Sequence, residues 1–289
     1  MLGARGRQKG IFMMRVLAGI FAVLAISIPW AAQAKSAKRG IAYDLAAAAD
    51  LHALSKGVSW WYNWGSAPNP AVPATYLKQY HMDYYPMLWN FSFQASTVVA
   101  FLQANPAIRY LLVLNEPNVG GQAYVTPQQA AQLWPQYEAV AKQARVKIVG
   151  PQITWGTMPG YTDPVAWLDA FYAAYEAAHH GRPPRIDYLG FHWYDYGLDA
   201  QLDRLDKYNK PIWVTEFANW DSQITTLAGQ EAQMTAMVAT CEQRSDVFRY
   251  AWFTGRWSND VHFTSLLDSA AGELTALGQT YLSLPFSTT

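Results

Sequence analysis

Two apolar segments of this 289-residue chain each stop at a glutamate, and they constrain its fold more than any other feature. Residues 111–118 read L-L-V-L-N-E-P-N, and residues 211–218 read P-I-W-V-T-E-F-A. Runs this rich in apolar and β-branched residues are typical of strands buried in a sheet that is covered on both faces. We therefore expect Glu116 and Glu216 to emerge at the same rim of one parallel sheet.

The rest of the chain alternates between short apolar runs and amphipathic stretches, which is the pattern of a parallel α/β fold. Eight strands are predicted, at residues 40–43, 57–62, 82–89, 110–114, 147–151, 186–194, 212–215 and 248–253. Helices are predicted over residues 127–144, from residue 163 onward and within residues 222–244. Eight such units favour a single (β/α)8 TIM barrel, and residues 264–267 are a further strand candidate.

The first 34 residues have the layout of a secretory signal peptide. Four basic residues precede an uncharged apolar run at residues 16–28, and Ala32 and Ala34 then offer the spacing that a signal peptidase reads. That run is shorter than the roughly 20 residues of a membrane-spanning helix; an uncleaved anchor is the alternative. We expect cleavage after Ala34, one domain over residues 35–289, a secreted or periplasmic location, and no stable membrane association afterwards.

Charge and cysteine content exclude several functional classes. The 21 Lys and Arg residues balance 21 Asp and Glu residues, which does not suggest a nucleic-acid partner. Cys241 is the only cysteine, so the chain has no intrachain disulfide and no metal site built on several cysteines. It also lacks the motifs of zinc proteases, P-loops, dinucleotide-binding folds and nucleophile elbows. We expect a monomer without a metal or cofactor.

The chain holds an excess of aromatic residues, with 13 Trp and 18 Tyr. Flat aromatic faces can stack on the apolar C–H faces of sugar rings, whereas large aromatic side chains also fill protein cores. Both uses are open for the tryptophans near the ends of predicted strands, which are Trp60, Trp64, Trp89, Trp155 and Trp252. Asn63 lies next to Trp64 and joins them as a candidate substrate-binding residue.

Glu116 and Glu216 follow the fourth and seventh predicted strands, whose ends face each other across the mouth of an eight-stranded barrel. Two carboxyl groups about 5 to 5.5 Å apart serve a retaining glycosidase, and a gap of about 6.5 to 9.5 Å serves an inverting one. Opposed strand ends favour the shorter gap. The alternative, a pair of surface charges, fits poorly because an unpaired charge at the end of an apolar strand is costly.

Further polar residues are candidates for the same site. The amide of Asn115 either donates to a sugar hydroxyl or caps the turn before Glu116. In the sixth predicted strand, the alternation of Y-L-G-F-H-W-Y directs His192 and Tyr194 into the barrel. His192 then binds a carboxylate or substrate, or is a core histidine. The same alternation puts Trp213 on the strand face opposite Glu216, so Trp213 is predicted to be core.

Seven motifs recur in order along the chain. They are K-R-G-I-A-Y at residues 38–43, V-S-W-W-Y-N-W at 58–64, Y-Y-P-M-L-W at 84–89, L-N-E-P-N at 114–118, F-H-W-Y at 191–194, W-V-T-E-F at 213–217 and Y-A-W-F at 250–253. The ordered set resembles glycoside hydrolase family 128, a glycosyl hydrolase catalytic-core family of clan A that includes the fungal alkali-sensitive linkage proteins.

The resemblance implies a (β/α)8 barrel that hydrolyses β-1,3-glucan with retention of configuration, and we expect endo action. It implies Glu116 as the general acid/base and Glu216 as the nucleophile. Substrate or support roles carry over to Asn115, His192, Tyr194, Trp252, Trp64 and Trp89. The alternatives are the same scaffold acting on another β-glycan, such as a β-1,4-mannan or a mixed-linkage glucan, transglycosylation, and a secreted glucan-binding protein without activity.

Overall fold

The computed structural model describes residues 35–287, and these residues form one sheet of nine parallel strands. The strands are β1 (Arg39–Ala42), β2 (Trp60–Tyr62), β3 (Asp83–Tyr84), β4 (Met87–Leu88), β5 (Tyr110–Val113), β6 (Lys147–Ile153), β7 (Tyr188–Trp193), β8 (Ile212–Phe217) and β9 (Val247–Trp252). Their order is β3-β2-β1-β9-β8-β7-β6-β5-β4. Since β1 pairs with β9, the sheet curls round on itself.

The two outer strands of that order, β3 and β4, are halves of one barrel position. β3 pairs with β2 and β4 pairs with β5, and only Tyr85 and Pro86 separate the two halves. Proline has no N–H to donate to a ladder, which suits an interruption at this point. The predicted (β/α)8 barrel is confirmed, with β5 in the fourth position and β8 in the seventh. The extra candidate at residues 264–267 forms only an isolated bridge, from Leu267 to Leu274.

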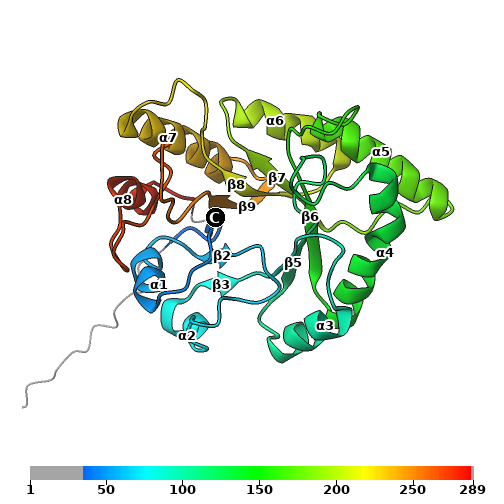
Figure 1. Cartoon of the computed structure of the whole chain (residues 1–289), viewed down its shortest axis with the longest axis horizontal. Coiled ribbons are helices and arrows are strands. Elements are labelled where there is room, and N and C mark those ends of the chain that lie inside the picture. The colour runs from blue at the N-terminus through cyan, green and yellow to red at the C-terminus, as the bar shows by residue number, and fades with distance from the viewer. Residues whose placement is uncertain (1–34, 288–289) are drawn as a thin grey trace, which may run out of the picture. The chain divides into compact units, whose positions relative to one another are not determined.

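Helices connect the strands and form the outer layer around them (Figure 1). They are α1 (Ala48–Leu54), α2 (Tyr76–Tyr80), α3 (Ala95–Ala104), α4 (Pro127–Ala144), α5 (Pro164–Ala178), α6 (Leu198–Leu205), α7 (Leu227–Gln243) and α8 (Ala276–Ser283), with a 3-10 turn at Asp206–Tyr208. The predicted bounds of α4 are confirmed. Its start is fixed by a capping box, in which Thr126 and Gln129 each accept a hydrogen bond from the other's backbone N–H.

Aromatic side chains fill the barrel interior at the amino-terminal ends of the strands. The ring of Trp213 on β8 lies 5.1 Å from that of Trp60, 5.3 Å from that of Tyr85 and 4.9 Å from that of Tyr110. The guanidinium of Arg249 lies 5.3 Å from the Trp213 ring, at cation–π distance. This end is therefore a packed core, and the carboxyl-terminal ends of the strands are left for a site.

The first described residues fasten the start of the domain to the barrel. Nζ of Lys35 donates to the carbonyl oxygens of Val58 at 2.8 Å and His81 at 2.9 Å. Oγ of Ser36 donates to Oε1 of Glu242 at 2.5 Å. The signal peptide predicted over residues 1–34 lies outside the described residues. Among residues 35–287, no helix combines the length and the apolar character needed to cross a membrane.

Candidate active site

Glu116 and Glu216 lie together at the carboxyl-terminal end of the barrel. Glu116 follows β5, and Glu216 lies near the end of β8. One carboxylate oxygen of Glu116 lies within 4.8 Å of one of Glu216. Glu116 is 9% exposed and Glu216 is 5% exposed. Two buried carboxylates this close require hydrogen-bond donors around them, because burial and mutual repulsion both disfavour their charge.

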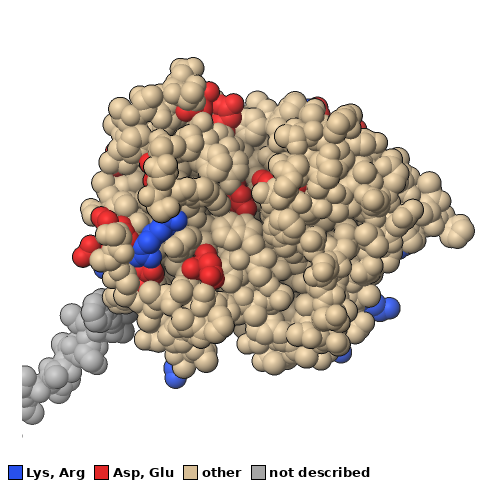
Figure 2. Space-filling view, viewed as in Figure 1, with Lys and Arg blue, Asp and Glu red and all other residues tan. Residues whose placement is uncertain are grey.

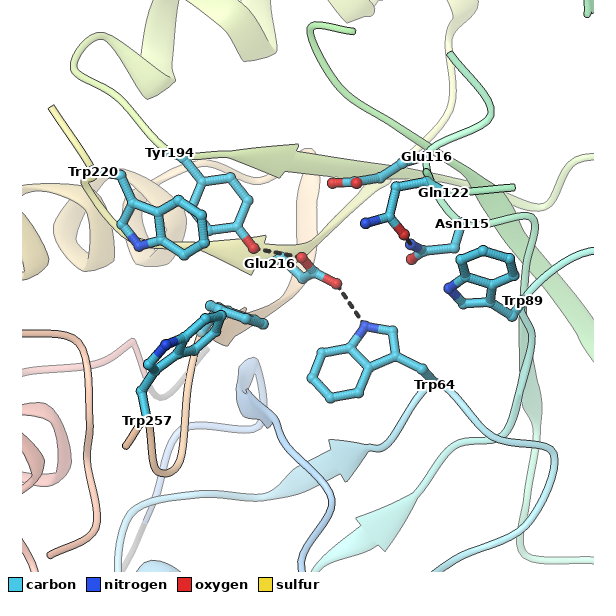
Figure 3. A pocket seen from close by; sticks show the side chains of 10 residues that line it. Trp64, Trp89, Asn115, Glu116, Gln122, Tyr194, Glu216, Trp220 and Trp257 are labelled. Carbon is cyan, nitrogen blue, oxygen red and sulfur yellow. Dashed lines mark hydrogen bonds between the residues drawn. The ribbon is translucent and has the colours of Figure 1, made fainter. Parts of the chain in front are cut away.

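Three side chains donate hydrogen bonds to Glu216. Its Oε1 accepts from the phenol of Tyr62 at 2.9 Å and from the indole Nε1 of Trp64 at 2.7 Å. Its Oε2 accepts from the phenol of Tyr194 at 2.5 Å (Figure 3). Burial, and then the charge of Glu216, raises the pKa of both phenols well above the ordinary value, so both stay protonated. An indole N–H can only donate. All three groups therefore hold the Glu216 carboxylate in one fixed orientation.

The fully buried imidazole of His192 lies between the two glutamates. Its Nδ1 is 2.8 Å from Oε1 of Glu116 and 3.3 Å from Oε2 of Glu216. Burial alone would lower the pKa of His192. The charge of Glu216, together with the hydrogen bond and charge of Glu116, outweighs burial, and the pKa lies above its ordinary value. Nδ1 of His192 therefore lies within reach of both carboxylates.

The backbone that presents Glu116 is held in an uncommon conformation. Leu114 has a φ of 57° and Glu116 a φ of 43°, both in the left-handed region that few non-glycine residues adopt. The N–H of Asn115 donates to the carbonyl oxygen of Trp89 at 2.8 Å, and the N–H of Glu116 donates to that of Gln152 at 2.8 Å. Strain of this kind persists only where neighbouring structure fixes it. Here the two neighbours of β5 in the sheet fix it, through Trp89 after β4 and Gln152 on β6.

The two glutamates face a cavity of about 310 Å³. Trp220 and Trp257 lie on one side of Glu216, and Trp89 lies on the other side with Asn115 and Gln122 (Figure 3). Trp64, Tyr194 and Phe253 complete the lining. The face of the molecule seen in Figure 2 is mostly uncharged, with acidic side chains near its centre. Flat aromatic surfaces with few charges suit a neutral sugar.

Glu116, His192 and Glu216 form a group of metal-binding residue types, with donor atoms within 4.8 Å of one another. These atoms are already engaged with each other, because Nδ1 of His192 lies at hydrogen-bond distance from Glu116 and close to Glu216. A cation would have to displace those contacts. The observed arrangement is that of groups that hold and pass a proton.

Comparison with known proteins places the chain in a family. The model of the family described as glycosyl hydrolase catalytic core matches residues 40–281. The chain belongs to this family. A solved structure of a family 128 (subgroup II) endo-β-1,3-glucanase from Pseudomonas viridiflava is 59% identical to this chain, with a TM-score of 0.86 over 88% of this chain and 100% of that one. The resemblance to glycoside hydrolase family 128 is thereby confirmed.

More distant family 128 structures differ in their mode of action. A subgroup I endo-β-1,3-glucanase from Amycolatopsis mediterranei, in complex with laminarihexaose, is 27% identical, with a TM-score of 0.63 over 86% of this chain and 99% of that one. A subgroup III curdlan-specific exo-β-1,3-glucanase from Blastomyces gilchristii, in complex with glucose, is 25% identical, with a TM-score of 0.63 over 86% of this chain and 98% of that one.

A curated relative of this chain is a longer protein. Alkali-sensitive linkage protein 1 of Schizosaccharomyces pombe is 26% identical over 265 residues, which is 86% of this chain. The chain spans only 45% of the length of that relative.

Most of the site residues expected from the sequence meet at the cavity. Glu116, Glu216, Asn115, Tyr194, Trp64 and Trp89 line it, and His192 is buried between the two glutamates. Nδ2 of Asn115 donates to Oε1 of Gln122 at 3.1 Å. Oδ1 of Asn115 is buried and has no partner among the described residues.

Trp60 and Trp252 do not reach the cavity, which corrects the expectation that they contact sugar. Both are fully buried. Trp60 packs on Trp213 in the barrel interior, whereas Trp252 packs on Phe217 and on Tyr281 of α8. A tryptophan with no exposed face has no surface on which a sugar ring can stack.

Asn63 and Trp155 also lie outside the cavity lining. Oδ1 of Asn63 accepts from the phenol of Tyr84 at 2.7 Å and from the N–H of Gly65 at 3.1 Å, so Asn63 shapes the loop next to Trp64. Trp155 is 45% exposed, and its indole donates to Gln201 at 2.8 Å.

Sequence reasoning missed five residues of the site, which are Tyr62, Gln122, Trp220, Phe253 and Trp257. Trp220 and Trp257 belong to the aromatic excess and lie shortly after β8 and β9. That combination was the available signal. Tyr62 lies inside a predicted strand and Gln122 in a loop, where nothing marked either residue.

Proposed function

We propose that this chain is a secreted, retaining endo-β-1,3-glucanase. The observation that carries the proposal is the pair of buried carboxylates at the carboxyl-terminal end of the barrel, with oxygens of Glu116 and Glu216 within 4.8 Å. Retaining glycosidases hold their carboxyl groups about 5 to 5.5 Å apart, whereas inverting enzymes leave room for a water between them. Family membership and the laminarihexaose complex of a relative support β-1,3-glucan as the substrate.

The two glutamates take different roles because their surroundings differ. Glu216 accepts hydrogen bonds from Tyr62, Trp64 and Tyr194, which favour its ionised form, and it attacks the anomeric carbon. Glu116, whose contact is with His192, donates its proton to the leaving glycosidic oxygen. Water then attacks the anomeric carbon and gives a proton to Glu116 as general base. The bond to Glu216 breaks, the sugar leaves with a new hydroxyl, and the acid is regenerated.

Relatives support endo action more than exo action. The Pseudomonas viridiflava enzyme, at 59% identity, is an endo-β-1,3-glucanase, whereas the exo-acting Blastomyces gilchristii enzyme is 25% identical. An endo enzyme releases a ladder of oligosaccharides early in the reaction, whereas an exo enzyme releases mainly one short product.

A product profile tests the proposal. The purified protein is incubated with laminarin, curdlan, barley β-glucan and a β-1,4-mannan, and early products are separated by size. We expect oligosaccharides from the β-1,3-glucans, with the β-anomer appearing first by proton NMR. The α-anomer as first product would contradict retention, and preferential cleavage of mannan or mixed-linkage glucan would change the substrate. Tight laminarin binding without product would favour a glucan-binding protein.

Secretion is proposed from the signal-peptide layout of residues 1–34. The hydrogen bonds of Lys35 and Ser36 to the barrel support a mature domain that begins next to Ala34. Mass spectrometry of the protein exported by a bacterial host should give a mature chain beginning at Lys35. Full-length protein retained in the cell membrane would favour an uncleaved anchor.

A further inference from the structure

A buried glutamine outside the cavity joins the two loops that carry its aromatic residues. Gln230 lies near the start of α7 and is fully buried. Its Nε2 donates to the carbonyl oxygens of Asn219 at 2.8 Å and His262 at 2.7 Å. Its Oε1 lies 3.3 Å from the backbone N–H of Asn219 and accepts from it. Asn219 follows β8 and His262 follows β9, so one amide fixes both loops to each other and to α7.

Each of the joined loops contributes an indole to the cavity. We call Trp220, Phe253 and Trp257 the aromatic wall. Trp220, next to Asn219 in the chain, stacks on His262 with ring centroids 5.3 Å apart and an interplanar angle of 12°. The Trp220 ring lies 6.0 Å from that of Trp257, which lies 5.4 Å from that of Phe253. The polar contacts of Gln230 and the stacking of His262 therefore act on the same group of rings.

The ring of Trp220 also contacts Tyr194, which lies beside Glu216. Its ring centroid is 4.4 Å from that of Tyr194, which donates to Glu216. The backbone N–H of Trp220 donates to the carbonyl oxygen of Tyr194 at 2.8 Å. Tyr194 directly follows β7, so the strand holds it in place whether or not Gln230 is present. The position of Trp220 relative to Trp257 depends on the two loops that Gln230 joins.

A rigid platform binds a sugar more tightly than a mobile one, because its side chains are already ordered before the ligand arrives. The loops after β8 and β9 are irregular, so side-chain contacts must supply that order. Gln230 uses both its amide donors and its carbonyl for this purpose. A buried polar group that loses its hydrogen-bond partner is left unsatisfied. Without the Gln230 amide, the carbonyl oxygens of Asn219 and His262 would lose their donor.

We infer that Gln230 is a positioning residue that holds the aromatic wall in place, so that the ring of Trp257, which is 47% exposed, serves as a platform for a glucose unit of β-1,3-glucan on the Trp220 side of Glu216. Gln230 touches no sugar and acts through Trp220 and Trp257. The inference rests on the proposed function and adds to it a residue responsible for substrate affinity.

Kinetics on laminarihexaose test the inference with a matched control. Gln230→Leu keeps the bulk of the side chain and removes its three hydrogen bonds. We expect KM to rise about tenfold and kcat to change less than about threefold. The control is Val238→Ala, a buried core substitution on α7 two turns further from the mouth. It should lower Tm while KM stays within about twofold of the parent value.

Two further measurements keep the test decisive. If Gln230→Leu does not fold, His262→Ala replaces it, because His262 is a half-buried loop residue whose ring contacts Trp220; its KM should rise in the same direction. Calorimetry in the inactive Glu216→Gln background should show laminarihexaose binding weakened about tenfold by Gln230→Leu.

The possible failures can be told apart. An active parent whose Gln230 and His262 variants keep the parent KM and Kd overturns the role of Gln230 alone, as does an equal rise of KM in Val238→Ala. A parent that releases no sugar from laminarin and binds no laminarihexaose overturns the proposed function, and the inference with it.

Discussion

The phenol of Tyr194 donates to Oε2 of Glu216 across 2.5 Å. Tyr194 follows β7 and Glu216 lies on β8, so the contact joins neighbouring strands at the point where the barrel opens. The hydroxyl and the carboxylate are both held by strand ends, and the geometry of the sheet therefore sets their distance.

Tyr194→Phe removes this donor and little else. A hydrogen bond to a charged group contributes about 1.5 to 3 kcal/mol, so we expect kcat on laminarin to fall about 10- to 100-fold. Circular dichroism should show an unchanged fold. Parent-level turnover in a folded variant would mean that the contact does not serve the reaction.

Glu216→Ala should abolish laminarin hydrolysis while glucan binding persists. In the space left by the carboxylate, azide can attack the anomeric carbon and restore turnover, giving an α-glycosyl azide, inverted relative to the β-linked substrate. Mass spectrometry and NMR identify that product. Glu273→Ala, at an exposed position, is the control and should retain full activity. Ordinary hydrolysis by Glu216→Ala without azide would exclude Glu216 as the nucleophile.

The raised pKa of His192 should make stability fall on the alkaline side. A folded-state pKa above the unfolded value of 6.5 means that the folded protein binds this proton more tightly. The stabilisation is fully present below pH 6.5 and is lost as pH rises through the folded-state pKa. This pH dependence is measured by urea unfolding of the parent and of His192→Gln at pH values between about 5 and about 9, which bracket the ordinary histidine pKa. Equal pH dependence in both proteins would contradict the assignment.

Asp50 should stabilise the fold at neutral pH and lose its effect in acid. Its carboxylate accepts from Nη1 and Nη2 of Arg256 at 2.6 and 2.8 Å and from the N–H of Gly272 at 2.7 Å. Burial raises the pKa of Asp50, but the hydrogen bonds of Arg256 and Gly272 and the charge of Arg256 outweigh it, so the pKa lies below 3.8. The contribution is present above pH 3.8 and is lost as pH falls through the folded-state pKa.

Asp50→Asn should therefore destabilise the protein by about 2 kcal/mol at pH 7, because Arg256 loses its ionic partner. The difference from the parent, measured by urea unfolding, should shrink toward pH 3. The matched control is Asp268→Asn at an exposed position. A parent–variant difference that stays constant down to pH 3 would show that ionised Asp50 is not its source.

Gly190→Ala should weaken both the fold and the active site. A Cβ at Gly190 would lie 2.0 Å from Oε1 of Gln152, which also accepts from Oγ1 of Thr215 at 2.5 Å. Overpacking of this kind costs about 1 to 3 kcal/mol. The backbone carbonyl oxygen of Gln152 accepts from the N–H of Glu116, so a shift of Gln152 would move Glu116 and lower kcat as well. Thermal unfolding and laminarin kinetics check both effects, and a variant with parent Tm and kcat would contradict them.

Local patterns predicted the fold and the meeting of Glu116 and Glu216 at one site, because both depend on short stretches of sequence. The bounds of α4 follow from a cap and an apolar periodicity, and the glutamates were marked by the runs that they end. Alternation failed at β8. Trp213 is core, as predicted, but it packs inside the barrel and not on the face opposite Glu216, because the register with β7 shifts between Val214 and Glu216. Such a bulge reverses which face of the strand the following side chains occupy, and no residue type in residues 211–218 predicts it.

The walls of the cavity could not be predicted for a different reason. Trp252 and Phe253 are adjacent, yet Trp252 packs on α8 and Phe253 lines the cavity. Trp220 and Trp257 lie in loops whose path depends on contacts with distant residues, as the bonds of Gln230 to Asn219 and His262 show. Sequence marks such residues as aromatic, but tertiary contacts decide which of them meet the substrate.

The packing of Trp213 with Trp60, Tyr85 and Tyr110 closes the barrel to passage from end to end. A polysaccharide that reaches Glu216 would therefore have to lie across the rim, with every part of it entering and leaving on the same side. Among residues 35–287 these rings leave no passage along the barrel axis. Under the proposed function, the number of glucose units bound is therefore set by the loops around the rim and not by the length of the barrel.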